Sequence, residues 1–76
     1  MLYYISQIDL GRIMKIGDLV RVRTKWEFCY PEYKGVLGII TEIIQLRNNR
    51  RIWWLHPYVR GVERTSMPQD TLEVIR

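Results

Sequence analysis

Glycine residues interrupt the strand-like segments of this chain, and their positions constrain the fold more than any other feature of the sequence. Gly17-Asp18 is a turn-forming pair before a β-type run at residues 19–24, and Gly38 lies inside a second run, at residues 35–46. A glycine inside a strand is typical of a bulge or a tight bend. The second run also has too many adjacent apolar residues for strict alternation, which indicates that its facing changes at the bend. The sequence therefore predicts a small, strongly bent β-barrel.

A hairpin is expected where the second run ends. Asn48-Asn49 lies at its centre, because asparagine tolerates the left-handed backbone that a two-residue turn needs. Such a turn places Ile44 opposite Trp53 in the returning strand, which we expect at residues 51–59. Proline has no N–H to donate to a neighbouring strand, so Pro57 predicts that the far end of that strand lies at a sheet edge.

The last part of the chain contains a helix-start pattern. Ser66-Met-Pro-Gln69 has the form of a capping box, in which the Ser66 hydroxyl accepts a backbone N–H and Gln69 reaches back. Only a single helical turn fits between this box and the last short strand, expected at residues 71–75.

Alternation along each strand predicts which residues face the core. Val20 and Val22 are expected to point inward from the first strand, and Leu72 and Val74 from the last one. In the returning strand, alternation separates two sets of side chains, and we expect the first set to be core. These sets are Trp53, Leu55 and Val59 on one face, and Ile52, Trp54, His56 and Tyr58 on the other.

The composition changes at Met14, and this change divides the chain. The 76 residues are enough for one domain. Residues 1–13 are apolar and poorly patterned, so they form an N-terminal arm, an extra strand, or an extension upstream of the true start. Residues 14–76 form the barrel domain. The longest uncharged run in the first part, residues 1–8, is too short to span a membrane and lacks the features of a signal peptide. Together with a single cysteine, this predicts a cytoplasmic protein without a membrane partner.

Three segments resemble the SH3-like barrels, and most closely their KOW-type members. They are Gly17-Asp18-Leu-Val-Arg-Val, Lys34-Gly35-Val-Leu-Gly38-Ile-Ile40 and Met67-Pro-Gln-Asp-Thr-Leu. The chain is also similar to short SH3-like proteins of tailed phages, cyanophages among them. The resemblance implies an all-β fold: a small SH3-like barrel of about five strands, with a single 3₁₀ turn before the last strand and an N-terminal extension. A phage origin would place the protein in the host cytoplasm.

The charge of the chain points to an anionic partner. Twelve Lys and Arg residues against eight Asp and Glu give a net charge of +4, which favours nucleic acid, DNA or RNA. Arginine binds phosphate bidentately, and aromatic side chains on one face of a strand can stack on bases. The alternatives are a solvated turn for the arginines, and an aromatic face covered by the N-terminal segment. The candidate phosphate contacts are Arg21, Arg23, Lys34, Arg47, Arg50 and Arg51, and the candidate stacking residues are Trp54 and Tyr58.

A different function is predicted by the aromatic stretch at residues 25–34. Its aromatic side chains could line a groove for a proline-rich peptide, cage a cationic group, or fold back on the core. With residues 1–13, they would form the contact surface of a protein-interaction module, such as a phage structural or host-interaction protein, or of a homo-oligomer. The candidate protein-binding residues are Trp26, Phe28, Tyr30 and Tyr33.

Enzymatic function is not expected. The sequence contains no phosphate-binding glycine loop, no nucleophile elbow and no series of zinc ligands. His56 is the only histidine and Cys29 the only cysteine, so no catalytic residue, metal site or cofactor is predicted. The expected function is non-catalytic binding, of nucleic acid first and of protein as the alternative.

Overall fold

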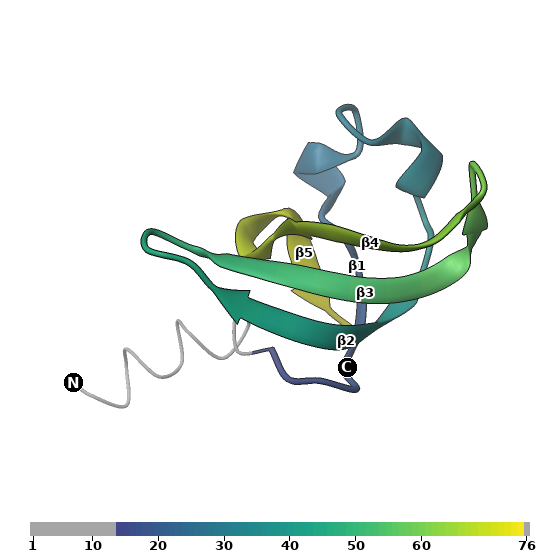
Figure 1. Cartoon of the computed structure of the whole chain (residues 1–76). Helices are drawn as coiled ribbons and strands as arrows, with labels where there is room; N and C mark the ends of the chain where they lie inside the picture. Colours follow the sequence, from purple (N-terminus) through teal and green to yellow (C-terminus); the bar gives the residue numbers. More distant parts are fainter. Residues whose placement is uncertain (1–13, 76) are drawn as a thin grey trace.

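Five antiparallel strands form a single sheet in the computed structural model, which describes residues 14–75. The strands are β1 (Leu19–Val22), β2 (Gly38–Gln45), β3 (Arg50–Val59), β4 (Val62–Pro68) and β5 (Leu72–Val74), in the spatial order β4-β3-β2-β1-β5. A 3₁₀ turn, η3 (Gln69–Thr71), leads directly into β5. The expected all-β class, the five strands and the 3₁₀ turn before the last strand are therefore confirmed (Figure 1). The predicted arm at residues 1–13 lies outside the described residues.

The connection between β1 and β2 is a long excursion that contains two further 3₁₀ turns. These are η1 (Thr24–Trp26) and η2 (Pro31–Tyr33), and Figure 1 shows them together on one side of the sheet. Pro31 begins η2, where its missing N–H costs nothing. The excursion brings Tyr33 over the sheet, where it is only 8% exposed. This segment therefore closes one side of the core.

The core lies between the curved sheet and this excursion. Val20, Val22 and Leu72 are buried as expected, and Val74 packs against them from β5. The buried hydrophobic side chains come from all five strands, from the residue that starts the described chain and from η2. The core consists of Met14, Val20, Val22, Tyr33, Ile40, Ile52, Trp54, Met67 and Leu72.

The predicted facing of β3 is wrong. Ile52, Trp54 and His56 are buried, whereas Leu55 is 46% exposed; of the set expected inside, only Val59 packs against the core. Gly38 supplies the physical reason. A Cβ on Gly38 would lie 2.8 Å from Cζ3 of Trp54 and 2.5 Å from the carbonyl oxygen of Leu55. The missing side chain thus makes room for the Trp54 ring on the core side.

The bend predicted in the second run exists, but it lies at Thr41 and not at Gly38. Ile40 pairs with Trp54 and Glu42 pairs with Trp53, so Thr41 is the extra residue of a β-bulge. A bulge changes the parity of the strand. Ile40 is buried and Ile43 packs against the same core, although strict alternation would place them on opposite faces.

The hairpin and the helix start also differ from expectation. Gln45 pairs with Arg50, and the Leu46 N–H donates to the Asn49 carbonyl oxygen (2.7 Å), so the turn is centred on Arg47-Asn48, one residue earlier than the predicted Asn48-Asn49. As a result Ile44 lies opposite Arg51 and not opposite Trp53. The predicted capping box is absent from the described turn, because Ser66 belongs to β4 and η3 has no side-chain cap.

Candidate nucleic-acid interface

Three clefts follow one another from the β2–β3 hairpin to the excursion. The first, which we call the hairpin cleft, has a volume of about 280 Å³, and the second, the middle cleft, about 260 Å³. The third, the aromatic cleft, has about 480 Å³. Asp70 lines both the hairpin and the middle cleft, and Lys25 lines both the middle and the aromatic cleft. Neighbouring clefts therefore share a lining residue, and together we call the three clefts the basic track.

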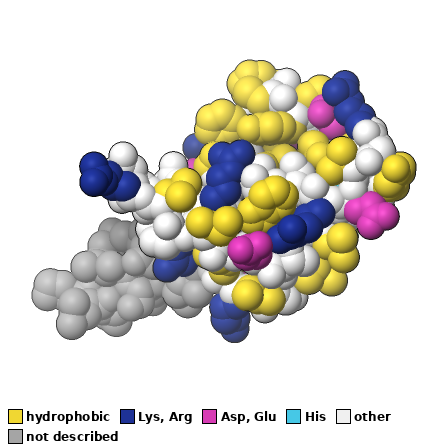
Figure 2. All heavy atoms as spheres, in the orientation of Figure 1, with side chains coloured by type: hydrophobic (Ala, Val, Ile, Leu, Met, Phe, Trp, Pro, Cys, Tyr) yellow, Lys and Arg dark blue, Asp and Glu magenta, His cyan; other side chains and the backbone are white. Residues whose placement is uncertain are grey.

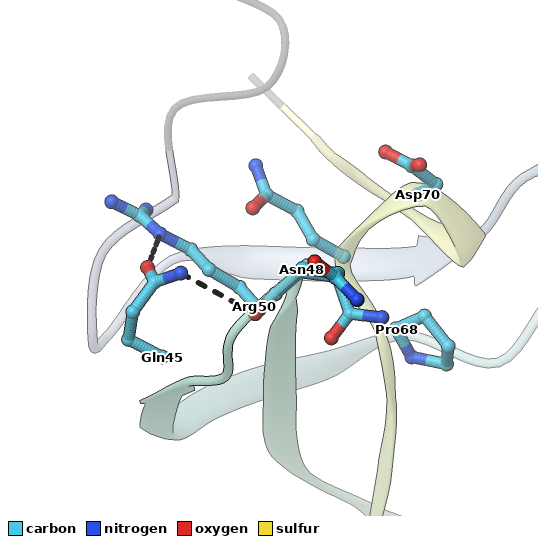
Figure 3. Close-up of a pocket in the computed structure, with 7 residues that line it drawn as sticks. Gln45, Asn48, Arg50, Pro68 and Asp70 are labelled. Atoms are coloured by element: carbon cyan, nitrogen blue, oxygen red, sulfur yellow. Dashed lines mark hydrogen bonds between the residues drawn. The ribbon is translucent and has the colours of Figure 1, made fainter.

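The hairpin cleft is walled by the β2–β3 turn on one side and by the approach to η3 on the other. Arg50 Nε donates to Gln45 Oε1 (3.0 Å), and Gln45 Nε2 donates to the carbonyl oxygens of Leu46 (2.9 Å) and Asn49 (3.4 Å). Gln45 thus holds the turn and orients the Arg50 guanidinium at its base (Figure 3). The lining residues are Gln45, Asn48, Asn49, Arg50, Pro68, Gln69 and Asp70.

The middle cleft joins two cationic side chains to one carboxylate. Arg23, Lys25, Trp26 and Asp70 line it. Arg23 also has Nη1 4.0 Å from Glu73 Oε1, a long and partly solvated contact that leaves its guanidinium available. Trp26 lines the cleft and also packs against the core from the excursion. Arg23 and Lys25 give this cleft two cationic side chains, which is the chemistry that binds phosphate.

The aromatic cleft contains the most exposed aromatic ring of the described chain. Phe28 is 79% exposed and lines the same cleft as two exposed lysines, Lys25 and Lys34. An exposed ring beside cations is the arrangement that stacks on a base while its neighbours neutralise the flanking phosphates. The remaining lining residues are Thr24, Glu27 and Pro31.

The predicted phosphate contacts divide into two groups. Arg23, Lys34 and Arg50 lie on the basic track, and Arg47 is exposed in the loop that borders the hairpin cleft. The other two basic residues are engaged elsewhere. Arg21 Nε is 2.7 Å from Glu73 Oε2 across the β1–β5 pair, and Arg51 Nε donates to Ser66 Oγ (3.0 Å) across the β3–β4 pair. The structure therefore does not bring all six together.

The predicted stacking pair is not formed. Trp54 is 0% exposed and its ring centroid lies 5.6 Å from Tyr33 and 5.0 Å from His56, so no base can reach it. Tyr58 is 70% exposed, but it lies at the end of β3 opposite the hairpin cleft (Figure 1). The core side of β3 is covered by Tyr33, which meets His56 edge-on at 5.1 Å.

The four aromatic residues predicted to bind a protein do not share a groove. Tyr33 is buried, and Trp26 and Tyr30 pack partly buried against the core. Only Phe28 points into solvent. The excursion therefore uses three of its aromatic side chains to complete the core and offers the fourth for contact.

Several residues of the track were not expected there. Lys25 and Phe28 belong to a stretch in which charge alternates with aromatic side chains, and this pattern is the sequence signal that indicates them. Asn48, Asn49 and Asp70 carry no such signal, because their common cleft exists only after the hairpin has folded beside η3.

A separate exposed surface lies on the outer side of the sheet. Leu19 pairs with Ile39 and Ile39 with Leu55, which sets the three side chains in a row across β1, β2 and β3. They are 37%, 47% and 46% exposed. We call them the apolar row. Figure 2 shows hydrophobic side chains interspersed with charged ones over the β2–β4 part of this surface.

Beside the apolar row, Arg64 joins three side chains. Its guanidinium carbon lies 4.5 Å from the centroid of the Trp53 ring, and its Nη2 lies 2.8 Å from Glu42 Oε1. Arg64 Nε also donates to Thr41 Oγ1 (3.1 Å). These contacts engage Arg64 on the outer face, away from the track.

Within residues 14–75, no three His, Cys, Asp or Glu side chains gather in a way that could hold a metal ion, and no helix is long and apolar enough to cross a membrane. Comparison with protein-family models, with curated proteins and with solved structures found no match to this chain.

Proposed function

We propose that this protein is a non-catalytic nucleic-acid-binding module that holds a single strand along the basic track. The observation that carries the proposal is a series of three clefts, linked by the shared lining residues Asp70 and Lys25. Four cationic side chains line these clefts: Arg50, Arg23, Lys25 and Lys34. The exposed Phe28 ring at one end of the track supplies a surface for base stacking. A single strand fits this arrangement better than a duplex, because only an unpaired base presents its ring face to Phe28.

The expected salt dependence follows from the number of cations on the track. Each phosphate neutralised on a single strand contributes a slope of about −0.7 to the logarithm of affinity against the logarithm of salt concentration. Contacts from the four cations would give a slope of about −2.8. Affinity would then fall roughly 50-fold between about 50 and 200 mM salt.

The proposal also includes the fold family and the origin that the sequence resemblance implies. The 3₁₀ turn directly before β5 supports a KOW-type SH3-like barrel, since the resemblance implies such a turn. A tailed-phage origin, with action in the host cytoplasm, rests on the resemblance of the sequence segments alone.

The test is fluorescence anisotropy with labelled single-stranded DNA, single-stranded RNA and duplex DNA at about 50 and 200 mM salt, the range in which phosphate contacts become visible. The double variant Lys25→Gln, Lys34→Gln should weaken binding and flatten the slope to about −1.4. The double variant Lys15→Gln, Arg60→Gln is the matched control, because it also removes two positive charges, from exposed residues that line none of the three clefts. No binding at the lower salt concentration, or equal effects of the two variants, would refute the proposal that a single strand binds along the basic track.

A second candidate function is protein binding, and the apolar row is the observation that favours it. A second copy of this chain is the occupant that the row implies, because two such rows related by a two-fold axis are complementary to each other. Light scattering after gel filtration tests this alternative: a dimer that Leu55→Lys converts to a monomer would support it, and a monomeric wild type would exclude it.

A further inference from the structure

We propose that the hairpin cleft receives one unpaired guanine, whose Watson–Crick edge is bound by the Asp70 carboxylate and the Asn48 amide. This inference rests on the proposed binding of a single strand along the basic track. It names the base that the track prefers and the residues that select it.

The position of Asp70 is the starting point. Its side chain is exposed and lines both the hairpin and the middle cleft of a track that carries four cationic side chains. Among residues 14–75, no hydrogen bond or ion pair engages its carboxylate. A free carboxylate repels the phosphates of a bound strand. It favours binding only where it accepts hydrogen bonds from a base, and the hairpin cleft is where a base can meet it.

The chemistry of the bases then selects guanine. An ionised carboxylate has two oxygens and accepts hydrogen bonds only. Guanine is the one common base whose Watson–Crick edge carries two adjacent donors, N1–H and the N2 amino group, and unpaired bases are read on this edge. Its O6 is an acceptor next to these donors. The Asn48 amide, which lines the same cleft, can donate to that oxygen.

The rest of the hairpin cleft fits the same ligand. Gln45 is occupied by the turn and by Arg50, so it acts as a positioning residue and keeps the wall of the cleft in place. Arg50 uses its Nε for Gln45, which leaves its two terminal nitrogens to bind the phosphate of the guanine nucleotide. Pro68 adds an apolar wall against which a base can lie (Figure 3).

The experiment compares labelled oligouridylates that carry a single central guanine, adenine, cytosine or inosine. A good bidentate contact discriminates against a wrong base by about 5- to 150-fold, so we expect the guanine oligonucleotide to bind at least fivefold more tightly than the adenine or cytosine one. Inosine lacks the N2 amino group and should lose most of this preference. Equal binding of all four with a steep salt slope would overturn the guanine site and leave the proposed function standing, whereas no binding of any oligonucleotide would overturn both.

Variants separate base reading from a structural role. Asp70→Asn should abolish the guanine preference and, because it removes a negative charge from the track, should leave or raise affinity for plain oligouridylate. Glu63→Gln is the matched control: it removes a negative charge from an exposed position in β4 that lines none of the three clefts, and it should keep the preference. A guanine preference that survives in Asp70→Asn would overturn the inference. If Asp70→Asn does not fold, Asn48→Ala, on an exposed loop, gives the second test and should reduce the preference of guanine over adenine, because adenine has an amino group where guanine presents O6 to the Asn48 amide.

Discussion

Gly38 and Trp54 form the contact whose substitution tests the packing of this core most directly. Gly38→Ala would place a Cβ 2.5 Å from the Leu55 carbonyl oxygen and 2.8 Å from Cζ3 of Trp54. Neither atom can move easily, because one belongs to the backbone of β3 and the other to a ring that is 0% exposed. Overpacking of this kind costs about 1–3 kcal/mol, and two rigid neighbours place Gly38→Ala near about 3 kcal/mol.

That cost is large for a chain of this length. In a domain of 60–100 residues, each 1 kcal/mol shifts the melting temperature by about 4–8 °C, so the expected loss is about 12–24 °C. Gly35→Ala is the comparison variant, since nothing lies within 4 Å of its Cβ and only its φ of 75° is unfavourable. Left-handed backbone costs about 1–2 kcal/mol, so Gly35→Ala should be the milder change.

A double-mutant cycle identifies the cause. Trp54→Leu removes the ring that Gly38→Ala meets, so the double variant should be less destabilised than the sum of the two single variants by at least about 1 kcal/mol. Thermal unfolding followed by circular dichroism gives the four free energies of unfolding. A Gly38→Ala protein as stable as the wild type, or a coupling energy near zero, would refute the argument that Gly38 directs Trp54 into the core.

Two further predictions concern the basic track. Phe28→Ala should leave the melting temperature unchanged, because the ring is 79% exposed. If a base stacks on this ring, the substitution should weaken single-strand binding by about 1–3 kcal/mol. An unchanged anisotropy curve would show that Phe28 does not contact the bound strand. Gln45→Ala removes three hydrogen bonds that hold the hairpin turn, so we expect a loss of about 1–2 kcal/mol in the free energy of unfolding. Urea unfolding measures this loss, and a stability equal to that of the wild type would show that the turn does not depend on Gln45.

The sequence by itself was sufficient where the physical cause is local. Val20 and Val22 alternate with exposed neighbours, and their burial follows from the period of a strand. The excess of apolar residues around Ile40 and Ile43 indicated a change of facing, and the bulge at Thr41 is that change. The single helical turn before the last strand was likewise predicted, because too few residues precede that strand for a longer helix.

Tertiary structure decided the features that depend on contacts between distant segments. Alternation separates the faces of β3 but does not say which one is core, and Gly38 on another strand settles that choice by leaving space for Trp54. The positions of the arginines are read from the sequence, but their ion-pair partners are not. Arg21 contacts Glu73 because β1 pairs with β5. The basic track joins the excursion, the hairpin and η3, and no local pattern encodes a cleft shared by three segments.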